Sequence, residues 1–292
     1  MKKQSSIVIL LVLMLALTGC ATQKIEENEQ TGTTTETRIV STSVAICEIL
    51  DALGVEEVVG VPETASQLPS RYEGVTQIGA PMSPDLELVS SVDATVILSP
   101  ISLQGDLQSK YDAAKLESYF VDLNSVEGMY ASIETLGTMF GKQEEAKKLV
   151  KEYETYLASL KEDLKGIENK KVLILMGLPG SYVVATEHSY VGSLVKLLGA
   201  TNVYEDHSTE EFINVNTEDM LQKNPDIILR TSHALPEQVK QMFEEEFKEN
   251  DIWKHFEAVK AGKVYDLSNE HFGMSANLKY QDAIKELIPY LQ

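Results

Sequence analysis

Arginine and cysteine are scarce in this chain of 292 residues. The charge balance bears on which partners the protein can bind, and the few cysteines bear on whether it can form a disulfide. The arginines are Arg38, Arg71 and Arg230, and the formal net charge is −20. Such an acidic surface excludes nucleic acid as a partner, because binding to phosphates requires a basic patch. The cysteines are Cys20 and Cys47. No intrachain disulfide is expected, since Cys20 lies at the end of a predicted signal segment and Cys47 follows a helical apolar pattern, which predicts a small buried side chain.

The first twenty residues have the pattern of a signal peptide. Two lysines precede an apolar run over residues 7–17, which is shorter than the roughly 20 residues of a membrane span. Leu17-Thr18-Gly19-Cys20 resembles a bacterial lipobox, so we expect a signal peptide over residues 1–19 and a lipid on Cys20. The polar segment 20–37 is then a flexible tether. The alternative is a transmembrane anchor.

These features predict a lipid-anchored protein on the extracellular face of the cell membrane. Removal of the two signal lysines changes the charge from −20 to −22, and so acidic a domain stands away from anionic lipid.

The hydrophobic periodicity predicts an α/β protein of two lobes, each with a central, mostly parallel sheet, joined by one long α-helix. We expect an N-terminal lobe over residues 38–141, the linking helix over 142–167 and a C-terminal lobe over 168–292. Predicted strands cover residues 38–41, 58–61, 75–78, 94–99, 118–122, 171–176, 181–185 and 263–267. Predicted helices cover residues 46–53, 107–116, 126–140, 143–164, 191–198 and 276–291, and others begin at Pro84, capped by Ser83, and at Pro236.

An internal repeat relates residues 79–100 to residues 215–234. Aligning Ile97-Leu98 on Ile228-Leu229 places Glu87 over Glu218, each ten residues before its isoleucine. Met82 precedes the helix of the first copy, and His233 follows the strand of the second. Chain that enters or leaves a strand at the carboxyl edge of an α/β sheet is where such folds bind ligands.

A thioether and an imidazole on two facing lobes would suit a haem iron. Taken alone, Met82 is more typical of packing and His233 of a surface or capping residue. Competing residues are His207 and His255, which have structural surroundings, and His188, His271 and Met274, whose roles stay open. A zinc site would need about three nitrogen or carboxylate ligands, and the five scattered histidines show no paired spacing.

Four segments carry a family resemblance: IGAPMSPDLELV, RTSHALPEQVKQMF, NDIWKHFEAVKAGKVYDL and HFGMSAN. They resemble the ABC-transporter solute-binding proteins whose two lobes are joined by one long helix, over residues 38–292. They are most similar to the haem-binding lipoproteins of Gram-positive iron-regulated surface systems. The resemblance implies a receptor that holds haem between its lobes, with Met82 and His233 as axial ligands, and delivers it to a permease for iron acquisition.

The resemblance also implies roles for other residues. Glu87 and Glu218 would dock onto arginines of a permease dimer. Ser41, Thr42 and Ser43 begin the first helix, where free amides would anchor the haem propionates, although plain helix capping explains them equally well. We expect a monomer that receives haem from surface donor proteins.

Two alternatives remain at this stage. A ferric siderophore or cobalamin receptor would share the fold, but a siderophore site would offer arginines, which this chain has in small number. A haem-processing enzyme is a more distant alternative. Iron held by both methionine and histidine has no open position for oxygen chemistry, and the sequence has no glycine-rich phosphate loop and no nucleophile and base motif. We therefore expect no enzymatic activity.

Overall fold

The structure is a computed structural model and describes residues 36–205, 209–214 and 216–292. The chain divides after Glu36, and the unit Thr37–Gln292 is compact and is the one described below. The predicted signal peptide, the lipidation site Cys20, most of the predicted tether and His207 lie outside the described residues. None of the helices among the described residues has the length and apolar character needed to cross a membrane.

The N-terminal half forms an all-parallel five-stranded sheet in the order β3-β2-β1-β6-β7. Its strands are β1 (Ile39–Ser41), β2 (Val58–Val61), β3 (Thr76–Gln77), β6 (Val96–Pro100) and β7 (Ser118–Val121). The helices between them are α1 (Val44–Ala52), α2 (Leu86–Ser91) and α3 (Gln104–Ala114), with short 3₁₀ turns η1 (Ser70–Tyr72) and η2 (Ile101–Leu103). Buried strands of Val, Ile and Leu covered by helices explain why continuous apolar runs predicted this sheet.

The predicted start of the helix after Met82 is wrong. Ser83–Pro84 is strand β5, which pairs antiparallel with β4 (Gly79–Ala80) in a small hairpin. The N-cap is instead Asp85, whose carboxylate accepts hydrogen bonds from the amides of Glu87 at 2.9 Å and Leu88 at 3.1 Å. A carboxylate is as good a cap as a serine hydroxyl, and proline is also tolerated in an edge strand, so the motif was misplaced by two residues.

The C-terminal half contains a mixed six-stranded sheet. Strands β8 (Lys171–Leu178), β12 (Ile227–Ser232), β13 (Val264–Asp266) and β10 (Thr201–Asn202) are parallel, whereas β9 (Ser181–Ala185) and β11 (Phe212–Ile213) are antiparallel to their neighbours. Its helices are α6 (Tyr190–Leu197), α7 (Thr217–Lys223), α8 (Pro236–Glu249) and α9 (Glu257–Lys260), with the 3₁₀ turn η4 (Asp251–His255). The two-lobe α/β fold predicted from periodicity is confirmed.

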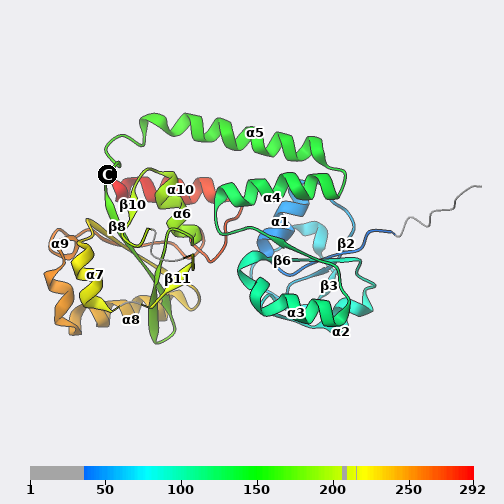
Figure 1. Cartoon of the computed structure of the whole chain (residues 1–292), viewed down its shortest axis with the longest axis horizontal. Helices are drawn as coiled ribbons and strands as arrows, with labels where there is room; N and C mark the ends of the chain where they lie inside the picture. Colours follow the sequence, from blue (N-terminus) through cyan, green and yellow to red (C-terminus); the bar gives the residue numbers. More distant parts are fainter. Residues whose placement is uncertain (1–35, 206–208, 215) are drawn as a thin grey trace, which may run out of the picture. The chain divides into compact units, whose positions relative to one another are not determined.

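Three helices pack together and connect the two halves: α4 (Val126–Met139), α5 (Gln143–Ser159), which continues into the 3₁₀ turn η3 (Leu160–Glu162), and the C-terminal α10 (Tyr280–Leu291). Helix α5 lies along both α4 and α10 (Figure 1). Tyr130 of α4 stacks on Tyr153 of α5 with ring centroids 4.3 Å apart, and Tyr280 of α10 meets both rings edge to face. Tyr156 also contacts Tyr280. We call these four residues the tyrosine cluster, and it belongs to a buried core that contains residues of both halves.

Candidate functional site

Met82 lies in the two-residue turn of the β4–β5 hairpin. Gly79 enters that hairpin with φ +92, a conformation that favours glycine, and its carbonyl accepts the amide of Glu63 at 2.8 Å. The Met82 side chain is 63 % exposed, the highest value among the exposed large apolar residues described. A methionine that served only for packing would be buried, so this position favours the ligand hypothesis for Met82 over the packing hypothesis.

His233 follows the last residue of β12, at the carboxyl edge of the C-terminal sheet. Its amide donates to the carbonyl of Gly177 in β8 at 3.0 Å, which fixes the backbone at this position. The preceding residue is fixed as well, because the Ser232 hydroxyl donates to Asn269 at 3.0 Å. The His233 side chain is exposed. A strand end that is fixed by two hydrogen bonds therefore presents an exposed imidazole, which is compatible with a ligand-binding histidine.

The Ser41-Thr42-Ser43 segment joins β1 to α1 and is buried. The Thr42 hydroxyl donates to Ser99 at 3.0 Å, and the Ser41 hydroxyl donates to the carbonyl of Ser43 at 3.0 Å. Ser43 is the N-cap of α1, but its side chain makes no capping hydrogen bond. Side-chain capping of α1 therefore does not account for the serine at position 43. The first-turn amides of α1 are the hydrogen-bond donors that this end of the helix can offer to an anion.

Glu87 and Glu218 occupy the same position in the two copies of the repeat. Each is the second residue of its helix, after the N-caps Asp85 and Asn216, and each side chain is exposed. Helix α2 precedes β6 and helix α7 precedes β12, which is the relation that the repeat predicts. Both carboxylates therefore lie in the first turn of a helix, where acidic residues are common.

A cavity of about 900 Å³ is lined by residues of both halves. It does not include Met82 or His233. Its lining contains His188, Lys196, which forms an ion pair with Glu187, and the further acidic residues Asp122, Glu127, Glu210 and Glu211. Sequence reasoning left His188 open, and the structure places it here. Because the acidic residues of this cavity outnumber its single lysine, it is a poor site for a dianionic macrocycle, and we do not assign the haem to it.

A hydrogen bond joins two residues of this lining that come from different halves of the molecule. The amide group of Asn124 donates to Oε1 of Glu211 at 3.0 Å, while Oε2 of Glu211 is buried without a hydrogen-bond partner. Burial raises the pKa of Glu211, Asn124 opposes that shift and the charge of Asp122 adds to it. Sequence reasoning missed this contact, because 87 residues separate its partners.

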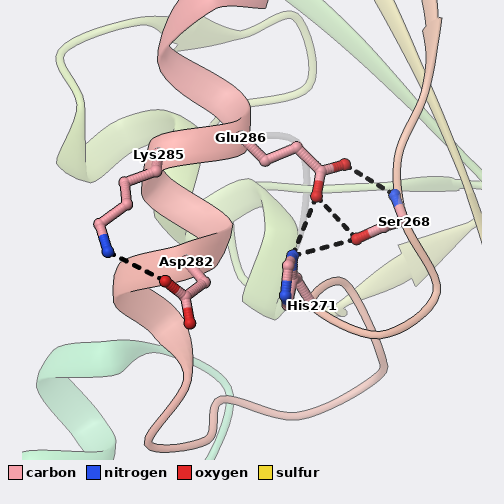
Figure 2. A network of polar contacts seen from close by, with 5 residues as sticks. All are labelled: Ser268, His271, Asp282, Lys285 and Glu286. Atoms are coloured by element: carbon pink, nitrogen blue, oxygen red, sulfur yellow. Dashed lines mark hydrogen bonds and ion pairs between the residues drawn. The ribbon is translucent and has the colours of Figure 1, made fainter.

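His271 is held by a polar network that includes Glu286, in the middle of α10 (Figure 2). Its Nδ1 lies 2.9 Å from Oε2 of Glu286 and 3.1 Å from the Ser268 hydroxyl, which also donates to Glu286 at 2.7 Å. Burial raises the pKa of Glu286, but the hydrogen bonds from Ser268 and His271 outweigh it and lower the pKa below its usual range. The network ties the 268–271 segment to α10, so a structural role accounts for His271.

The remaining candidates have simpler surroundings. His255 is exposed at the end of η4, and Met274 is partly buried in the loop before α10. Cys47 is fully buried, and burial raises its pKa to about 12, so the thiol is an inert apolar side chain as predicted. Within the described ranges, no group of three or more His, Cys, Asp and Glu residues is arranged to hold a metal ion.

Comparisons with known proteins identify the family to which this chain belongs. The periplasmic binding protein family model matches residues 39–270. The high-affinity heme uptake system protein IsdE of Staphylococcus aureus strain Newman is 43% identical over 287 residues, covering 96% of this chain and 94% of that protein.

Two solved structures are also similar. The structure of S. aureus IsdE complexed with heme has 43% identity and a TM-score of 0.81, covering 88% of this chain and 99% of that one. An ABC transporter substrate-binding protein from Listeria monocytogenes EGD-e has 45% identity and a TM-score of 0.81, covering 87% and 98%. Family model, sequence identity and fold agree over nearly the whole of the described chain, and the protein therefore belongs to the periplasmic binding protein family.

Proposed function

We propose that this protein is the haem receptor of an ABC importer, which holds haem between its two lobes and passes it to the permease. The observation that carries the proposal is the placement of Met82 and His233. Each is an exposed side chain on an ordered turn or strand end, one in each half of the molecule. The 43% identity to a protein named for heme uptake supports the same ligand.

The chemistry of the pair suits carriage. Methionine and histidine on opposite faces of the iron fill both axial positions, so no open position is left for oxygen. A thioether and a neutral imidazole add no net charge, and both can leave when the haem is transferred. The proposed activity is binding and delivery without catalysis.

The haem propionates need donors, and we assign them to the segment Ser41, Thr42 and Ser43. Because the hydroxyls of Ser41 and Thr42 are already used inside the protein, the first-turn amides of α1 would make the contact. Helix α1 has nine residues, and its dipole favours an anion at this end.

The arginines argue against a ferric siderophore. Arg38 donates to the carbonyl of Val92 at 2.9 Å, and Arg71 lies 3.3 Å from Asp51. Arg230 holds Asp266 with two hydrogen bonds of 2.6 and 2.7 Å. All three arginines are therefore engaged within the protein, whereas an anionic siderophore would need cations free to receive it.

Delivery requires a permease, and we propose that Glu87 and Glu218 dock onto it. Two like charges at equivalent positions of a repeat match a permease built from two equivalent subunits. We propose further that a lipid on Cys20 anchors a monomeric receptor to the outer face of the membrane, where haem donor proteins can reach it.

The test is a visible spectrum. Protein beginning at Cys20 is purified from cells grown with haemin, and we expect the Soret band of a six-coordinate haem at one haem per chain. The matched control is the same protein with both Met82→Ala and His233→Ala. Wild-type protein that stays colourless with excess haemin, yet binds a ferric siderophore or cobalamin, would refute the proposal.

A further inference from the structure

Leu235, two residues after His233, has an unusual backbone conformation. Its φ is 48° and its ψ is 58°, in the left-handed region that a Cβ atom disfavours. It also directly precedes Pro236, and a residue before proline is normally extended. The other non-glycine residues described with positive φ are Asp93, Lys115, Asn169 and Asn224, all polar. Leu235 is thus the one apolar residue in this group.

The neighbouring contacts hold Leu235 in this conformation. Its carbonyl accepts hydrogen bonds from the amides of Gln238 and Val239, both at 3.0 Å, and so starts α8. On the other side, the His233 amide is bound to Gly177. The short link from β12 to α8 therefore leaves the Leu235 side chain pointing away from the core, and it is 52 % exposed.

Met82, like Leu235, is an apolar residue with an exposed side chain. Five large apolar side chains of the described residues are markedly exposed, and Met82 and Leu235 are the two most exposed of them. One is a proposed iron ligand, and the other lies beside the second proposed ligand. Exposed apolar side chains at both proposed ligand positions are typical of a site whose ligand is itself largely apolar.

We propose that Leu235 contacts the porphyrin ring beside His233 and so selects for a flat apolar macrocycle, whatever metal it carries. This inference rests on the proposed function. In this proposal, the left-handed conformation turns an apolar side chain out toward the ligand. Glycine or asparagine would fit the backbone better but would offer the ring no apolar surface.

The experiment compares haem with metal-free protoporphyrin IX, which cannot use the axial ligands. In the full chain, Leu235→Gly and Leu235→Asn should weaken binding of both by about five- to tenfold, the effect expected for losing a partly buried leucine contact. Without ligand, both variants should melt at or above the wild-type temperature, because strain is relieved. Leu235→Met should bind both ligands like the wild type.

His233→Ala is the contrasting variant, and it should lose haem affinity strongly while its affinity for protoporphyrin changes little. Met139→Ala, which removes another exposed apolar side chain at the end of α4, is the matched control and should change neither affinity. Glycine and asparagine variants that bind protoporphyrin like the wild type would overturn the inference, even if their haem affinity fell. Wild-type protein that binds neither ligand would instead refute the proposed function.

Discussion

Oε2 of Glu286 accepts hydrogen bonds from two directions, from Nδ1 of His271 at 2.9 Å and from the Ser268 hydroxyl at 2.7 Å. Oε1 accepts the backbone amide of Ser268 at 2.8 Å. Both carboxylate oxygens are therefore used, and this one side chain of α10 fixes the loop that contains Ser268 and His271.

Replacing Glu286 by glutamine should lower the free energy of unfolding by about 1 to 2 kcal/mol at pH 7, because the amide nitrogen cannot accept these bonds. The pKa of Glu286 is lowered in the folded state. The stabilisation is therefore complete above the usual value of 4.5 and is lost as the pH falls through the folded pKa. Urea unfolding between pH 3 and 8 measures this. Lys285→Gln, in an exposed ion pair on the same helix, is the control and should have little effect. A wild-type-like Glu286→Gln at pH 7 would contradict the assignment.

Glu211→Gln should stabilise the folded protein at pH 7, whereas Glu286→Gln should destabilise it. Burial and Asp122 raise the pKa of Glu211, so ionisation above 4.5 destabilises the folded state, and glutamine removes that cost while still accepting from Asn124. We expect a higher melting temperature than wild type at pH 7 and equal melting temperatures below pH 4.5, measured by calorimetry without haem. Glu127→Gln, an exposed residue of the same cavity, serves as the control. Equal melting temperatures at every pH would show that the unpaired oxygen finds water.

His233→Ala and Met82→Ala should have different spectra. Loss of the imidazole should abolish or strongly weaken haem binding, whereas loss of the thioether should leave a five-coordinate or water-ligated haem. Absorption spectra of the two purified variants with haemin distinguish these outcomes, with His255→Ala as the control histidine. Spectra like that of the wild type from both variants would remove these residues from the iron.

The double variant Glu87→Ala and Glu218→Ala should bind haem like the wild type but impair uptake. Exposed charge pairs contribute about 0.2 to 1 kcal/mol, whereas desolvated pairs at an interface cost several when broken. Haem uptake by cells, or ATPase stimulation of the reconstituted permease, is the measurement. Glu134→Ala with Glu244→Ala removes two other exposed helical glutamates and should transport normally. Normal uptake by both double variants would leave Glu87 and Glu218 as ordinary surface residues.

Cys20→Ala should release the protein from the membrane without changing its affinity for haem. The reason is that residue 20 follows Leu17-Thr18-Gly19, where a lipid would be attached. Fractionation of cells and immunoblotting measure attachment, and Cys47→Ala controls for loss of a thiol. A variant found in the membrane fraction at the wild-type level would favour a transmembrane anchor.

Local patterns predicted much of the fold. The strands Val58–Val61 and Ser181–Ala185 have the predicted bounds, because each is an apolar run bounded by turn residues. The C-terminal helix begins at Tyr280, four residues later than predicted, since the preceding loop is fixed by contacts that no local pattern shows. Two-residue strands such as β10 and β11 were missed, because they form only through pairing with distant strands.

In the candidate site too, local sequence predicted some features, and others depend on tertiary contacts. The repeat placed Glu87 and Glu218 at equivalent helix positions, which the structure agrees with. The contact between Asn124 and Glu211, and the left-handed Leu235, follow from tertiary structure and had no signal in the sequence. The assignment of Met82 and His233 as ligands remains a prediction.

The tyrosine cluster joins helices that lie far apart in the sequence. Tyr280 of the last helix meets the rings of Tyr130 and Tyr153 edge to face, and the amide of Ala276 donates to the carbonyl of Leu123 at 2.7 Å. Because α10 is the last element of the chain, α4 and α5 are synthesised before the helix that completes their packing. During synthesis, the face of α4 and α5 that packs against Tyr280 would have no partner until α10 has been made. We therefore expect the two halves to fold as one cooperative unit after α10 has been synthesised.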